Sequence, residues 1–81
     1  MSDNLVDILE SSEYGAILKC RDLELADEFE DFLSETCFVL FQTKFDAGEV
    51  LFYFGQASSA VRVRELYERF IATVEQRGEG N

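Results

Sequence analysis

The chain has 81 residues and a formal net charge of −10, from seventeen acidic and seven basic residues, and it contains no histidine. This length limits it to one domain, residues 1–81. Apolar residues make up 47% of the chain and include eight Phe, which excludes a disordered acidic tail. We therefore expect one small folded domain with a Phe-rich core.

No apolar run approaches the ~18 residues of a membrane span, and no basic-then-apolar segment resembles a secretory signal. The pattern predicts a soluble, cytoplasmic protein. Two cysteines, Cys20 and Cys37, do not make the disulfide framework of a small secreted domain. Both are predicted to be buried thiols.

The first predicted element is a helix over residues 3–10. Ser2 is a suitable N-cap, and Asp3, Asp7 and Glu10 recur at helical spacing opposite an apolar side. Residues 11–13 then read as a connection.

Alternation of apolar and polar residues predicts a strand over residues 14–21, although Ile17 breaks the pattern. Asp22 is a good N-cap for a second helix over residues 22–36. This helix has the clearest periodicity in the chain.

Residues 38–55 are predicted to form a β-hairpin, because β-branched and aromatic runs flank Asp46, Ala47 and Gly48. These three suit a three-residue loop with Gly48 in the left-handed conformation. Bulky apolar residues occur on both faces of both strands. Either helices cover both faces, or one face is an interface.

A last helix is predicted over residues 59–76, followed by a frayed tail over residues 77–81, where Gly78 and Gly80 stop it. The element order is then αβαββα. This order predicts an α+β domain in which helices pack on a three-stranded sheet that includes the hairpin.

The residue types argue against catalysis. Without histidine the chain lacks the commonest general base and the commonest metal ligand. Its five glycines are scattered through turns and ends rather than gathered in a phosphate-binding loop, and its two cysteines lack the spacing of a zinc knuckle. We expect no enzymatic activity, no cofactor and no metal site.

The second predicted helix carries the most informative pattern. At about 100° per residue, its carboxylates fall on one side and its apolar residues on the other. The predicted acidic stripe comprises Glu24, Asp27, Glu28, Asp31 and Glu35, with Glu30 on its flank and with Asp7 and Glu10 as an extension if the first helix lies alongside.

An exposed helix usually mixes acidic and basic residues, because opposite charges four residues apart stabilise it. Here no Lys or Arg occurs between Asp22 and Thr43. Residues 1–35 carry eleven acids and two bases, whereas residues 36–81 carry six and five. The stripe is therefore either a binding face or a solvated, solubilising surface.

Five carboxylates over eleven residue steps span about 16 Å, and their spacing is close to the ~3.4 Å between phosphates along a DNA strand. The net charge opposes direct binding to nucleic acid or to an anionic membrane, so the expected partner is a basic protein surface. In size, charge and lack of catalytic residues the chain resembles the small acidic DNA-mimic inhibitors of the anti-CRISPR and anti-restriction class found in phages. The resemblance implies an inhibitor that occupies the nucleic-acid-binding groove of another protein or nuclease complex.

A second hypothesis belongs to a different class of function. The aromatic β surface suits a homodimerising or adaptor module. Its candidate anchors are Phe38, Leu40, Phe52 and Phe54.

Overall fold

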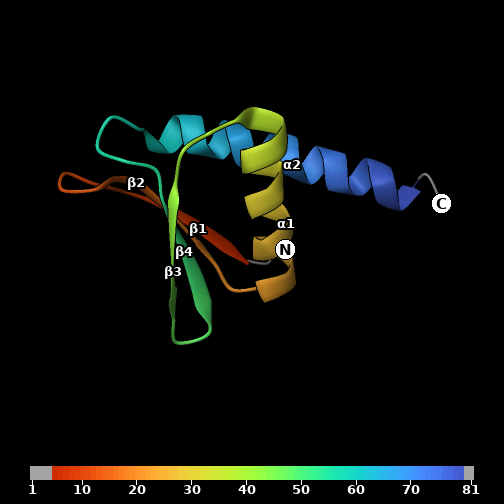
Figure 1. Cartoon of the computed structure of the whole chain (residues 1–81), viewed down its shortest axis with the longest axis horizontal. Helices are drawn as coiled ribbons and strands as arrows, with labels where there is room; N and C mark the ends of the chain where they lie inside the picture. Colours follow the sequence, from red (N-terminus) through yellow and green to blue (C-terminus); the bar gives the residue numbers. More distant parts are fainter. Residues whose placement is uncertain (1–4, 80–81) are drawn as a thin grey trace.

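The computed structural model describes the backbone of residues 5–79 and the side chains of residues 5–76. Within them, two helices pack on one face of a four-stranded antiparallel sheet with the strand order β1-β2-β4-β3 (Figure 1). The strands are β1 (Val6–Ser11), β2 (Gly15–Cys20), β3 (Gln42–Asp46) and β4 (Glu49–Tyr53), and the helices are α1 (Leu23–Asp31), continued by the π-helical segment η1 (Phe32–Cys37), and α2 (Ala60–Glu79). The α+β class is confirmed, with four strands instead of three.

The additional strand is β1, so the predicted helix over residues 3–10 is wrong for residues 6–10. Residues 3 and 4 lie outside the described part. Val6 and Ile8 pair with Cys20 and Leu18 of β2 in antiparallel register and join the core. Over so short a segment an apolar pattern fits both a helix and a strand, and pairing with β2 decides between them. The element order is therefore ββαββα.

The core lies between the sheet and the two helices. Its fully or nearly fully buried side chains are Ala16, Leu18, Cys20, Ala26, Phe29, Leu33, Phe52, Val63, Leu66 and Phe70. Phe29 is central, because its ring lies 5.2 Å from that of Phe52 on β4 and 5.0 Å from that of Phe70 on α2. The predicted Phe-rich core and the predicted apolar side of the second helix are confirmed.

The helix predicted over residues 22–36 is confirmed, but its last part is not α-helical. Asp22 caps α1, since its carboxylate accepts hydrogen bonds from the N–H groups of Glu24 and Leu25 at 3.0 and 3.1 Å. From Phe32 the chain winds as the π-helix η1. It ends at Phe38, whose φ of 54° is left-handed although the residue has a Cβ.

The predicted hairpin is confirmed with a shorter turn and narrower bounds. Ala47 and Gly48 have φ values of 51° and 82°, so they form a two-residue type I′ turn and Gly48 is left-handed as predicted. Residues 38–41 precede β3 and are not part of a strand.

Ser59 caps α2, because its Oγ accepts the N–H of Arg62 at 3.2 Å. The predicted frayed tail is wrong for residues 77–79, which continue α2 to Glu79. A single glycine in a helix costs only about 1 kcal/mol relative to alanine, so Gly78 does not end it. Residues 80 and 81 lie outside the described part. Among the described helices, none has the length and apolar character needed to cross a membrane.

Candidate protein interaction surfaces

The carboxylates of α1 form a continuous acidic face. Glu24, Asp27, Glu28 and Asp31 are exposed, and Glu30 is half-buried on their flank. This face is held rigidly, because Ala26 and Phe29 on the opposite side of α1 are buried in the core. We call Glu24, Asp27, Glu28 and Asp31 the acidic face.

Glu35 is exposed but belongs to η1 rather than to α1. A π-helix bonds each residue to the fifth one along, so it rotates less per residue than an α-helix. Glu35 is therefore turned away from the direction that a regular α-helix would give it. The acidic face runs from Glu24 to Asp31, a length of about 10 Å instead of the predicted ~16 Å.

Asp7 and Glu10 do not extend the acidic face, so that part of the prediction is wrong. Both lie on β1, and their spacing of three residues directs them to opposite faces of the sheet. Asp7 forms an ion pair with Arg21. The carboxylate of Glu10 accepts the N–H of Ala60 at 3.0 Å.

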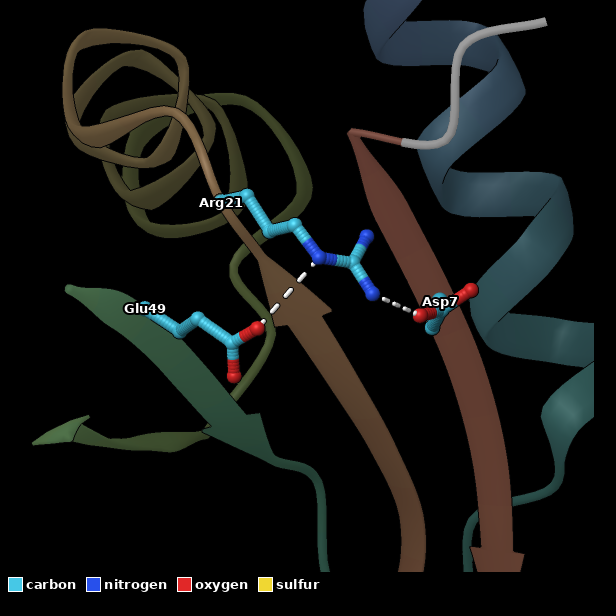
Figure 2. A network of polar contacts seen from close by, with 3 residues as sticks. All are labelled: Asp7, Arg21 and Glu49. Carbon is cyan, nitrogen blue, oxygen red and sulfur yellow. Dashed lines mark hydrogen bonds and ion pairs between the residues drawn. The ribbon is translucent and has the colours of Figure 1, made fainter. Parts of the chain in front are cut away.

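Arg21 connects two strands on the uncovered side of the sheet. Figure 2 shows its guanidinium between Asp7 of β1 and Glu49 of β4, and its Nε lies 3.3 Å from Glu49 Oε2. The hydrogen bond and charge of Asp7 raise the pKa of Arg21 further above its ordinary value. These groups are partly exposed, so the contribution to stability is modest.

No described helix covers the other face of the sheet. Leu9, Ile17 and Tyr53 form a row across β1, β2 and β4, and Leu51 lies in the next row between Lys19 and Lys44. We call Leu9, Ile17, Leu51 and Tyr53 the open sheet face. The sequence allowed for an interface on one face of the sheet, but other residues were predicted as its anchors, although Ile17 on the polar side of β2 indicated this face.

Two of the four predicted apolar anchors belong to the core or pack against it. Phe52 has 0% exposure, and Phe54 is half-buried, with its ring 6.4 Å from those of Phe41 and Phe52. Phe52 pairs with Leu18 on the buried face of β2, so its side chain points toward the helices. Phe54 lies two residues further along and is directed to the same side. Phe38 and Leu40 differ, with 81% and 90% exposure.

The outer edge of β3 pairs with no other described strand. All five residues of β3 are exposed, and Phe45 has 64% exposure. A groove of about 220 Å³ separates this edge strand from α1. It is lined by Leu23, Ala26, Asp27, Glu30, Thr43, Lys44, Phe45 and Val50.

Both cysteines are free thiols. Cys20 is buried as predicted and its Sγ donates to the carbonyl of Asp22 at 3.3 Å, whereas Cys37 is half-buried. Burial raises the pKa of the Cys20 thiol. Among the side chains of residues 5–76, no group of three or more Cys, Asp or Glu is arranged to hold a metal ion.

Comparison of the chain with protein-family models, with curated proteins and with solved structures gives no match. The geometry itself defines a small α+β domain of ββαββα order. Its helical side carries an acidic face, and its opposite side is a sheet face that no described helix covers.

Proposed function

We propose that this chain is a small, non-enzymatic binding protein that docks its acidic face onto a basic protein surface and acts as an inhibitor of the DNA-mimic type. One observation supports the proposal most strongly. The exposed carboxylates of α1 form a row without a single intervening base, on a helix fixed to the core by Phe29.

The physical chemistry favours a partner that normally binds a polyanion. A row of about 10 Å corresponds to about three phosphates at ~3.4 Å spacing. Lys and Arg side chains in a nucleic-acid-binding groove form charge-assisted hydrogen bonds with carboxylates as they do with phosphates. The acidic face would therefore occupy a short section of such a groove and exclude the nucleic acid from it.

The test is capture of partners from a lysate at low and at moderate salt, with duplex DNA as competitor. The variant Glu24→Lys, Glu28→Lys and Asp31→Lys should stay folded and lose the salt-sensitive partner. A matched control reverses three exposed acids of α2, Glu65→Lys, Glu68→Lys and Glu75→Lys, and should retain the partner.

Unchanged capture by the α1 variant would contradict the proposal. Equal loss in both variants would also contradict it, because net charge rather than the acidic face would then control binding. Circular dichroism of both variants verifies that the helices are intact.

The open sheet face supports a second candidate, a homodimerising or adaptor module. Leu9, Ile17, Leu51 and Tyr53 lie where no described helix covers them. Association through this face would be insensitive to salt and would be lost in Ile17→Lys. A monomer in light scattering at tens of micromolar would exclude the homodimer version.

A further inference from the structure

The β3 edge offers unused backbone hydrogen-bonding groups. In an antiparallel ladder closed by a two-residue turn, alternate residues counted from the turn direct their N–H and C=O groups to the partner strand. In β3 these are Gln42, Lys44 and Asp46, so the groups of Thr43 and Phe45 point outward. Natural edge strands are usually protected by proline, a bulge or a covering segment. In the described part of the chain β3 has none of these three devices; of the charged side chains that also discourage edge pairing it carries Lys44 and Asp46, both on the face away from the helices.

The groove beside this edge is lined by apolar and acidic side chains and by Lys44, whose register opposite Leu51 directs its side chain to the other face of the sheet. Leu23, Asp27 and Glu30 recur at helical spacing on the flank of α1 that faces β3. Leu23 with 51% exposure and Phe45 with 64% provide the apolar part. Among the described side chains, neither Asp27 nor Glu30 takes part in an ion pair.

We propose that β3 receives an extended segment of a partner protein as a fifth strand, and that every second residue of this segment is an Arg or Lys facing α1. The aliphatic stems of these residues pack on Leu23 and Phe45, and their charged ends reach Asp27 and Glu30. The intervening residues fall on the side of Lys44 and are uncharged or acidic.

Charge decides between this partner and a second copy of the chain. Two copies joined antiparallel through β3 would place their α1 helices side by side on the same face of one continuous sheet. Asp27 and Glu30 of one copy would then meet the same carboxylates of the other, and like charges repel. A basic strand meets the opposite charge at the same positions.

The inference goes beyond the proposed function, because it depends on the β3 edge and on the flank of α1 beside it, and of the acidic face it uses only Asp27. Strand addition supplies main-chain hydrogen bonds, which are independent of salt to first order. The acidic face supplies long-range attraction, which salt screens.

The probe is an end-blocked heptapeptide of alternating Arg and Thr, titrated into the full chain and followed by fluorescence anisotropy. Two further peptides carry N-methyl groups, one on the arginine amides and one on the threonine amides. Antiparallel addition uses the arginine amides and parallel addition the threonine amides. We expect one methylated peptide to bind about tenfold more weakly than the other. Equal binding of both would overturn strand addition.

The matched protein variants are Thr43→Pro and Thr43→Val. Proline removes an outward-pointing N–H, which an edge strand tolerates, whereas valine keeps that N–H. Thr43→Pro should weaken peptide binding about tenfold and Thr43→Val should not. Circular dichroism and thermal melting verify that both variants fold.

A second pair of variants tests the role of charge. Asp27→Asn with Glu30→Gln should lose the peptide, whereas Glu65→Gln with Glu68→Gln on α2 should keep it. Peptide binding that survives Thr43→Pro overturns the inference. It leaves the proposed function intact, because that function is tested separately by the charge-reversal variants of α1 and α2. A dimer in sedimentation velocity that Thr43→Pro abolishes would also overturn it, because a second copy would then occupy the edge.

Discussion

The carboxylate of Glu10 on β1 accepts a hydrogen bond from the backbone N–H of Ala60, the first residue of α2, at 3.0 Å. Fifty residues separate the two in sequence. The first N–H groups of a helix lack partners inside the helix and carry a partial positive charge, so a carboxylate at this position stabilises it. Glu10 therefore fastens the start of the last helix to the first strand.

Replacement of Glu10 by alanine should lower the free energy of unfolding by about 1 kcal/mol, as for other lost helix caps. Urea denaturation at neutral pH measures this. Glu13→Ala removes the same charge from an exposed position nearby and serves as the control. Equal losses in the two variants would show that the bond to Ala60 contributes nothing.

Gly15 should be the least replaceable glycine among those described. An added Cβ would lie 1.8 Å from the carbonyl oxygen of Gly55, and the φ of 78° is left-handed. Gly48 has a similar φ of 82° but open space around it. Gly48→Ala should cost about 1 kcal/mol from backbone strain alone, and Gly15→Ala more than ~3 kcal/mol. Similar melting temperatures for the two variants would contradict the close approach of the backbone at Gly15 to the backbone at Gly55.

The buried thiol of Cys20 predicts a loss of stability at alkaline pH. Because burial raises its pKa, the fold favours the neutral thiol. This contribution is complete below the ordinary thiol pKa and is lost as pH rises through the raised one. As pH rises above about 8, the free energy of unfolding should fall more in the wild type than in Cys20→Ala. Cys37→Ala is the control for the removal of a thiol.

Phe38 combines a left-handed backbone with 81% exposure. A residue with a Cβ costs about 1–2 kcal/mol in this conformation, and exposure brings little burial energy in return. Phe38→Gly should therefore leave the protein as stable or up to about 1 kcal/mol more stable, in contrast to most Phe substitutions. Chemical denaturation decides this, and a loss of 2 kcal/mol or more would mean that the Phe38 ring is part of the core.

Local chemistry predicted much of this fold. Asp22 as N-cap, the left-handed Gly48, and the inner stripes of α1 and α2 all depend on residues close in sequence. The strand β1 depends instead on residues that are distant in sequence. Val6 and Ile8 fit a strand only once Leu18 and Cys20 lie beside them, and single-sequence periodicity contains no such information.

The candidate surfaces were predictable to different degrees. Exposure of the α1 carboxylates follows from helical periodicity, so the exposed positions of Glu24, Asp27, Glu28 and Asp31 were predicted correctly. Glu35 was misplaced because nothing in its neighbours indicates a π-helix. Phe52 and Phe38 were grouped together, yet Phe52 is buried on the helix-covered face of β4, whereas Phe38 ends η1 outside the sheet and is exposed.

The arrangement of charge about the sheet also gives the molecule an electric dipole. The helical side bears the acidic face, whereas on the opposite side Lys19, Arg21 and Lys44 are matched by acids such as Asp7 and Glu49. In the field of a basic surface, within a screening length of about 8–10 Å, such a molecule experiences a torque before any contact forms. The molecule would then approach the basic surface with α1 in front. The uncovered sheet face would point away from that surface and stay accessible while α1 is bound.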